Sequence, residues 1–216
     1  MSKALENLEN DHSDFDKKSL LDNPPSNPMD LFHTWFEEAN DGDDIEIHAC
    51  SLSTLNKNEL VPSSRIVYLK EIVSTNFIFY TNYNSRKGKE IESNPKACML
   101  FFWPYQQRQV LIYGSVSKID PKKSDAYFNS RPRKSKIGAW ASNQSAYINS
   151  RKELLKNFEE VEDKYKNMDI PRPSHWGGYA LKAFEIEFWQ GRPSRFHDRI
   201  NFCLTNKKWT IRRKNP

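Results

Sequence analysis

The fold class of this chain is decided by residues 76–103, NFIFYTNYNSRKGKEIESNPKACMLFFW. Two runs rich in β-branched and aromatic residues, at 76–81 and 97–103, enclose a charged segment whose start at Asn84 or Ser85 offers a helix-capping side chain. Similar β-type runs lie at 45–52, 65–72 and 109–119. The pattern predicts a meander of strands interrupted by one short helix.

Elements on either side complete the same pattern. A helix is predicted from Pro28, where apolar side chains recur on one helical face. Residues 121–166 are helical in character, and 182–191 and 199–212 return to strand alternation. Strands in runs, with the helices grouped apart from them, favour an antiparallel barrel or an α+β domain over a βαβ fold.

The domain organisation follows from length and local composition. A chain of 216 residues can fill one core, so residues 27–216 are expected to form a single domain. Residues 1–26 are rich in charged and small polar side chains and run into the breaker-rich LDNPPSNP. They cannot bury enough surface to order themselves and are expected to form a flexible arm.

The charge balance points to acidic partners. The 33 Lys and Arg residues exceed the 28 Asp and Glu residues, which gives a net charge of +5 and a pI near 9.0. Nucleic acid, a membrane surface and small phosphorylated ligands all fit this excess, and charge alone does not choose among them. No apolar run approaches the roughly 20 residues of a membrane helix, and the first residues are too acidic for a signal peptide, so a cytoplasmic protein is expected.

Familiar motifs of several enzyme classes are missing from the sequence. It has no GxGxxG or GxxxxGK[ST] cradle for nucleotide phosphate, no GxSxG elbow, and no CxxC or HExxH. The nearest metal-like pair, His48 and Cys50, has no second pair to complete four ligands, so no metal is expected. The three cysteines lie in apolar-alternating runs and are expected to be free thiols. Any phosphate would be held by side chains or by a helix end.

A candidate anion site lies at 80–89, YTNYNSRKGK. Ser85, Arg86 and Lys87 fall at the predicted helix N-terminus, directly after an apolar strand, where backbone N–H groups, the helix dipole and two cations converge. A solvated basic first turn is the alternative that this segment alone leaves open.

Two further cations, Arg65 and Lys70, bracket the apolar run IVYL. Because side chains alternate along a strand, positions five apart point to opposite faces unless a bulge intervenes, so these two residues are expected to serve different partners. Edge-strand charges that discourage aggregation are the alternative.

The stretch 127–145, YFNSRPRKSKIGAWASNQS, carries a candidate phosphate site. Tyr127, Arg131, Arg133 and Ser135 lie within nine residues of one another. Hydroxyl groups and a guanidinium fork suit a phosphate monoester. RNA binding is the competing use of such a basic and aromatic mixture, but no RNP-like motif or second basic stripe accompanies it.

The most specific stretch is 187–199, EFWQGRPSRFHDR. It combines Trp189 with Arg195, His197 and Arg199 at alternate positions, and in an extended chain these three would share one face. A histidine flanked by two arginines is expected to stay neutral, because nearby positive charge disfavours protonation. A purely structural, hydrogen-bonding histidine is the alternative.

These stretches, taken in order with 63–70, 79–91 and the WGGY at 176–179, resemble the pyridoxine/pyridoxamine 5'-phosphate oxidase family from about Pro28 to Pro216. The resemblance implies a Greek-key-like, FMN-binding split β-barrel that forms a homodimer with FMN at the subunit interface. Three departures stand out: Tyr68 at a usually aliphatic position, Phe196 in place of a leucine, and the tail RRKNP.

Site residues carry over by position. The resemblance assigns FMN to Arg65, Ile66, Val67, Tyr68, Leu69, Lys70, Tyr80, Thr81, Arg86, Lys87, Gln109, Gln144, Ser145, Trp189 and Arg199. It assigns the substrate to Lys70, Tyr127, Arg131, Ser135, Arg195, Phe196 and His197, of which Arg195 and His197 are expected to act at the reacting carbon.

The implied reaction is oxidation of pyridoxine or pyridoxamine 5'-phosphate to pyridoxal 5'-phosphate, with hydride transfer to the flavin and reoxidation by O2 to hydrogen peroxide. Two alternatives stay open. One is a flavin oxidase of the same fold acting on another substrate, such as a phenazine precursor, although the RPRKS cluster suits a phosphate. The other is a non-catalytic FMN-binding or nucleic-acid-binding module.

Overall fold

The structure is a computed structural model that describes residues 15–16 and 22–216. The chain divides into two compact units. We call His48–Leu100 with Ile112–Phe184 the central unit, and the described residues up to Ile47 with Phe101–Leu111 and Glu185–Pro216 the terminal unit. The arm expected at 1–26 lies largely outside the described residues.

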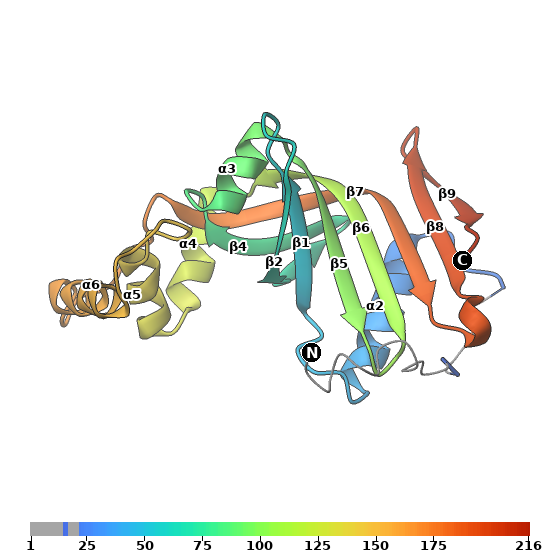
Figure 1. Cartoon of the computed structure of the whole chain (residues 1–216), viewed down its shortest axis with the longest axis horizontal. Coiled ribbons are helices and arrows are strands. Elements are labelled where there is room, and N and C mark those ends of the chain that lie inside the picture. Colours follow the sequence, from blue (N-terminus) through green and yellow to red (C-terminus); the bar gives the residue numbers. More distant parts are fainter. Residues whose placement is uncertain (1–14, 17–21) are drawn as a thin grey trace, which may run out of the picture. The chain divides into compact units, whose positions relative to one another are not determined.

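The central unit is built on antiparallel strands. They are β1 (Ala49–Leu55), β2 (Pro62–Tyr68), β3 (Glu71–Val73) and β4 (Asn76–Asn82), with parts of β5 (Lys96–Trp103), β6 (Arg108–Lys118) and β7 (Trp176–Gln190). The strand order is β2-β1-β5-β6-β7-β4-β3. The neighbouring strands β1, β5 and β6 can be followed in Figure 1. The pairings of β1 with β2 and β5, of β3 with β4, and of β4 with β7 are all antiparallel.

The run at 65–72, expected as one strand, is divided between β2 and β3. Backbone hydrogen bonds explain the break, because Leu69 N donates to His48 O at 2.8 Å whereas Lys70 N donates to Ile78 O at 2.9 Å. The chain therefore leaves the edge of β1 and joins β4 between these two residues. The first strand likewise begins at Ala49 rather than at 45.

The short helix predicted after β4 is α3 (Arg86–Ser93), capped by Ser85, whose hydroxyl accepts from Gly88 N. Gly88 is required here, because a Cβ at this position would lie 1.9 Å from Tyr83 O. The helical stretch 121–166 forms three helices, α4 (Pro121–Ser130), α5 (Arg133–Ala141) and α6 (Arg151–Lys164). Their packing core is formed by Phe128, Ile137, Tyr165, Ile170 and Trp176.

The terminal unit packs α2 (Pro28–Asn40) with strand segments through aromatic contacts. The ring of Phe32 lies 5.4 Å from Phe101, and that of Trp35 lies 5.2 Å from Phe188. The predicted strand at 199–212 is a hairpin of β8 (Asp198–Thr205) and β9 (Lys208–Arg213). Its turn has positive φ at Asn206 and Lys207, the geometry of a tight two-residue hairpin loop.

These elements confirm the predicted antiparallel α+β class. Cys50, Cys98 and Cys203 are free thiols, and Cys50 is buried beside β2, where its Sγ lies 3.6 Å from Val67 O. Among the described helices, none combines the length and the apolarity that crossing a bilayer demands.

Candidate functional site

A pocket of about 510 Å³ in the central unit collects many of the residues expected to bind FMN or substrate. It is formed by the end of β2, by β4, by the start of α3, and by the α4–α5 turn with residue 144. Its lining consists of Ile66, Val67, Tyr68, Lys70, Tyr80, Thr81, Lys87, Tyr127, Arg131, Pro132, Ser135, Gln144 and Trp176. Segments that were singled out separately in the sequence therefore share one cavity.

Arg131 supplies the clearest sign of an anion site in this pocket. Its Nη1 atom is buried and has no hydrogen-bond partner among the described residues, and its guanidinium lies 4.5 Å from the centre of the Trp176 ring. Burial lowers the pKa of Arg131, because it disfavours the charged form. A buried cationic donor of this kind is stabilised by an anionic acceptor such as a phosphate oxygen.

Three aromatic rings form a stack beside Arg131. Tyr80 and Tyr127 stack at 3.9 Å between ring centres, and Trp176 lies parallel to Tyr80 at 5.5 Å. The expected site contained both tyrosines but not Trp176, which stands in the WGGY block without an assigned role. Its position next to two glycines was the only available signal, and it indicates close packing rather than binding.

Lys87 lies at the N-terminal turn of α3. Its Nζ donates to Gln144 Oε1 at 2.9 Å and to Thr81 Oγ1 at 3.2 Å. Burial and the neighbouring Arg65 lower the pKa of Lys87 to about 8. Thr81, Lys87 and Gln144, which are far apart in the sequence, thus form one hydrogen-bonded group at a helix N-terminus, as an anion site there requires.

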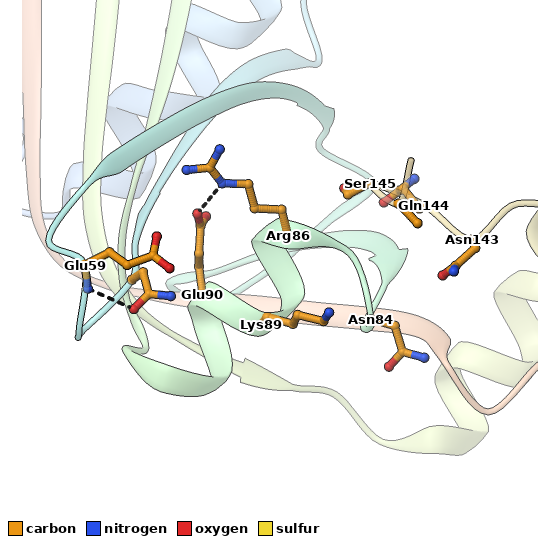
Figure 2. Close-up of a pocket in the computed structure, with 10 residues that line it drawn as sticks. Glu59, Asn84, Arg86, Lys89, Glu90, Asn143, Gln144 and Ser145 are labelled. Carbon is orange, nitrogen blue, oxygen red and sulfur yellow. Dashed lines mark hydrogen bonds and ion pairs between the residues drawn. The ribbon is translucent and has the colours of Figure 1, made fainter. Parts of the chain in front are cut away.

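A second cavity of about 390 Å³ lies at the same helix (Figure 2). It is lined by Asn56, Glu59, Asn84, Arg86, Lys89, Glu90, Asn143, Gln144, Ser145 and Ala146. Arg86 and Ser145, two of the residues expected to bind FMN, therefore belong to this cavity, and Gln144 lines both cavities.

Glu90 organises the arginines of this region. Its carboxylate accepts from Ser63 Oγ at 2.6 Å, Thr54 Oγ1 at 2.5 Å, Arg86 Nε at 2.8 Å and Arg65 Nη2 at 3.1 Å. Burial alone would raise the pKa of Glu90, but these hydrogen bonds outweigh it and lower the pKa to about 2. Glu90 was not anticipated, although its place four residues after Arg86 on a helix favours an ion pair.

Arg65 and Lys70 have different surroundings, but the predicted reason, alternation along one strand, does not apply, because the chain leaves β2 before it reaches Lys70. Arg65 contacts Glu90, Ser63 and Thr54, whereas Lys70 lines the 510 Å³ pocket. Arg133 turns away from the site, because its guanidinium donates to the backbone carbonyls of Met168 and Tyr165.

The terminal unit holds the remaining predicted residues, namely Gln109, Trp189, Arg195, Phe196, His197 and Arg199. The His197 ring lies 4.6 Å from that of Trp189, and its Nδ1 accepts from Arg192 N at 3.1 Å. Burial, Arg195 and Arg199 lower the pKa of His197, as the sequence predicted. Phe15 lies edge-on to both rings, at 5.8 Å from each.

The extended geometry expected for 195–199 is wrong. Pro193–Arg195 forms a 3-10 turn in which Ser194 and Arg195 have φ of 58° and 61°, and β8 begins only at Asp198. Arg195, His197 and Arg199 therefore do not alternate along one strand. Arg195 projects from an exposed turn, and the neighbouring Phe196 is 78% exposed.

Arg199 is anchored by a carboxylate and by the C-terminal tail. Its Nε and Nη2 lie 2.8 Å and 2.6 Å from Glu187 Oε1, and its Nη1 donates to Asn215 O at 3.1 Å. Across residues 15–16 and 22–216, no group of three His, Cys, Asp or Glu side chains could hold a metal ion.

Comparisons with known proteins give a consistent result. Residues 44–165 match the family described as pyridoxamine 5'-phosphate oxidase, and residues 176–216 match the pyridoxine 5'-phosphate oxidase C-terminal dimerisation region. The chain is 46% identical over 190 residues to a pyridoxine/pyridoxamine 5'-phosphate oxidase of Cyanothece sp., covering 88% of this chain and 89% of that protein. It is 45% identical over 212 residues to the protein of the same name from Flavobacterium johnsoniae, covering 97% and 99%.

A solved structure supports the fold assignment. The crystal structure of PhzG from Burkholderia lata, in complex with tetrahydrophenazine-1-carboxylic acid, superposes with a TM-score of 0.86 at 27% identity. The match covers 93% of this chain and 99% of that chain. The split-barrel α+β class predicted from the sequence is confirmed.

Proposed function

This chain belongs to the pyridoxamine 5'-phosphate oxidase family, and from that premise we propose that it oxidises pyridoxine or pyridoxamine 5'-phosphate to pyridoxal 5'-phosphate with FMN and O2. The observation that carries the proposal is the 510 Å³ pocket. Its lining includes Lys70, Arg131, Ser135 and the phenol ring of Tyr127. These groups match a phosphate monoester in charge and in hydrogen-bonding capacity.

The substrate phosphate is held by these four side chains. Arg131 would give its unpartnered Nη1 to a phosphate oxygen, and Lys70 would add a second positive charge. Holding the phosphate fixes the attached ring, which lowers the entropic part of the barrier. Tyr80 and Trp176, stacked parallel, give the pocket a flat apolar wall of the kind that orients an aromatic ring.

The FMN phosphate fits the cluster at the α3 N-terminus. Lys87, Arg86 and Arg65 supply the cations there, and Ser145 and Gln144 supply polar groups. When bound, FMN supplies the redox chemistry, accepting hydride from the substrate and returning the electrons to O2 as hydrogen peroxide. The role of the protein is to bind, to orient and to keep the reacting groups dry.

Arg195 and His197 act at the reacting end of the substrate. Arg195 lies on a turn with unusual backbone geometry, and His197 presents a neutral ring whose Nδ1 is fixed by Arg192 N. The other ring nitrogen then carries the proton and can donate a hydrogen bond. We infer a homodimer with FMN at its interface, since the matched dimerisation region, 176–216, contains Trp189, Arg195, His197 and Arg199.

The proposal is tested by mixing the purified protein anaerobically with pyridoxamine 5'-phosphate while the flavin absorbance near its visible maximum is followed, and then admitting air. Bleaching by substrate, followed by recovery with release of hydrogen peroxide, is the expected result. A yellow protein that does not bleach would retain the cofactor and reject the substrate. A colourless protein that cannot be reconstituted with FMN would reject the proposal altogether.

A second candidate is oxidation of a reduced phenazine, because the Burkholderia lata structure holds a tetrahydrophenazine carboxylic acid. The same experiment with tetrahydrophenazine-1-carboxylate separates the two. The buried, unpartnered Nη1 atom of Arg131 in the pocket favours the phosphorylated substrate. A non-catalytic binding module would bind FMN without peroxide release, and a nucleic-acid binder would lose affinity steeply with salt.

A further inference from the structure

We propose that the C-terminal tail is a positioning element for FMN binding, in which Lys214 sets the orientation of the Arg199 guanidinium through the shared carboxylate of Glu187. The inference rests on the proposed function for its ligand, because Arg199 is the residue expected to meet FMN. It concerns the part of the chain, RRKNP at 212–216, that departs from the usual family ending.

The geometry around Glu187 divides its two oxygens between two cations. Oε1 accepts from Arg199, at 2.8 Å from Nε and 2.6 Å from Nη2, and Oε2 accepts from Lys214 Nζ at 2.8 Å. The Glu187 side chain is only 3% exposed, whereas those of Arg199 and Lys214 are 30% and 37% exposed. A buried carboxylate therefore links two partly exposed cations.

Lys214 keeps Arg199 from taking both oxygens. Guanidinium and carboxylate groups prefer a bidentate pair with two parallel hydrogen bonds. With Oε2 occupied by Lys214, Arg199 makes both of its contacts to Oε1 and turns Nη1 toward Asn215 O, at 3.1 Å. Loss of the lysine would free Oε2 and allow Arg199 to rotate onto the carboxylate.

The charge balance of the cluster also predicts that loss of Lys214 would weaken ligand binding by Arg199. Lys214 Nζ also lies 3.3 Å from Glu185 Oε1, and Glu185 and Glu187 share one face of β7 because they are two residues apart. Two carboxylates face two cations in this cluster. Without Lys214 the cluster would carry a net negative charge, which would weaken the attraction of Arg199 for an anionic or electron-rich ligand.

The tail is held in place by the backbone as well as by side chains. Ile200 pairs with Arg213 in the β8–β9 ladder, and Lys214 N donates to Arg199 O at 3.0 Å. Lys214 therefore reaches Glu187 from a fixed position, and its effect on Arg199 does not depend on a mobile chain end.

The test is a titration of the dimeric apoprotein with FMN, in which binding is measured from the quenching of flavin fluorescence. The variants are Lys214→Met, Lys214→Arg and the charge-matched control Lys208→Met, an exposed residue of β9. Lys214→Met is expected to weaken FMN binding about fivefold, the size of a partly exposed ion pair. Lys214→Arg and Lys208→Met should keep FMN affinity within about twofold of the parent protein, and kcat at saturating FMN should be unchanged in the Lys208→Met control.

Each outcome bears on the inference. Equal FMN affinity in Lys214→Met and Lys208→Met would overturn it, because both variants lose the same net charge. A Lys214→Met protein that dissociates to monomers in sedimentation at the titration concentration would also overturn it, since assembly would then explain the loss. A parent protein that binds FMN and bleaches with substrate while Lys214→Met is unaffected overturns this inference alone, whereas a parent protein that binds no FMN overturns the proposed function with it.

Discussion

The two units hold their arginines in similar ways but present their reactive groups differently. In each unit an arginine rests on a carboxylate whose side chain is 3% exposed, Glu90 under Arg65 and Arg86, and Glu187 under Arg199. Around Glu90 the surrounding groups come from regular strands and a capped helix. In the terminal unit, Arg195 and Phe196 lie on an exposed turn in which Ser194 and Arg195 have positive φ.

This difference indicates that the central unit is suited to holding a ligand in one geometry, and the terminal unit to adjusting to a ligand as it reacts. Buried, hydrogen-bonded side chains on regular elements are held close to one geometry, which suits the phosphate ends of a cofactor and a substrate. An exposed turn can change its backbone angles at lower cost and suits groups that must accommodate a reacting ligand. Substitutions in the central unit are therefore expected to lower mainly the stability of the protein, and substitutions in the exposed turn of the terminal unit mainly its turnover.

The largest effect is expected from Glu90→Gln. The substitution keeps the shape of the side chain but leaves two arginines without their carboxylate, and it should cost the apoprotein about 3 kcal/mol in urea unfolding. Glu92→Gln, at an exposed position of the same helix, is the control and should change stability by less than about 0.5 kcal/mol. Equal stabilities of the two variants would contradict the conclusion that the buried Glu90 carboxylate stabilises the central unit.

The same variant gives a pH signature. The pKa of Glu90 lies at about 2 in the folded protein, below its ordinary value of 4.5. A group whose pKa is lowered by folding stabilises the protein fully above the unfolded value, and this contribution is lost as the pH falls through the folded value. The parent protein should therefore lose stability between pH 4.5 and about 2 more steeply than Glu90→Gln.

The next largest effect is expected from Arg195→Leu. Because Arg195 stands on the exposed turn and is not part of a buried network, its loss should lower kcat about 50-fold through lost positioning. FMN affinity should remain within about twofold of the parent value. Arg212→Leu, exposed on β9, is the control for charge. Loss of FMN in place of turnover would contradict the assignment of Arg195 to the substrate.

A third prediction concerns the pH dependence of FMN binding. The pKa of Lys87 in the apoprotein is about 8, and a phosphate prefers the protonated amine. Above pH 8 the neutral amine must take up a proton on binding, so affinity should fall by up to about tenfold per pH unit. Below pH 8 affinity should be level, until the phosphate itself gains a proton near its second pKa of about 6. Lys87→Met should bind FMN more weakly and lack the decline above pH 8; persistence of that decline would place its origin elsewhere.

The smallest effect is expected from Ser194→Gly. Glycine tolerates the φ of 58° found there, so stability should rise by less than about 1 kcal/mol. Lys207→Gly, with φ of 63° in the β8–β9 turn, should give a similar gain in melting temperature without a change in kcat. If Ser194→Gly also leaves kcat unchanged, the Ser194 side chain has no catalytic role.

Local patterns predicted most elements of the fold. Alternating β-branched and aromatic residues identified the strands, and the capping side chains of Asn84 and Ser85 marked the start of α3, of which Ser85 is the N-cap. The break after Leu69 was not predictable, because it depends on two hydrogen-bond partners from different parts of the chain, His48 just before β1 and Ile78 in β4. The turn at 193–195 was missed because an alternating pattern of cations resembles a strand, and the positive φ of Ser194 and Arg195 has no glycine to signal it.

The structure brings together cations that the sequence singled out, whereas some of the residues that these cations contact had no assigned role. Arg131, Lys87 and Lys70 were expected to bind phosphates, and the structure groups them around one pocket. Glu90 and Trp176 were missed, because their importance comes from what they contact rather than from their own chemistry. An anionic residue in a predicted anion site appears unfavourable until its buried arginine partners are known.

Cys50 bears on the chemical durability of the protein. It pairs with Val67, a residue that lines the 510 Å³ pocket, and burial raises the pKa of its thiol to about 12. Peroxide reacts with thiolates rather than thiols, and this sulfur is a thiol at every physiological pH. With the proposed reaction at this pocket, hydrogen peroxide would be released one strand away from a thiol that resists oxidation, and mass mapping after prolonged catalysis should find Cys50 unoxidised.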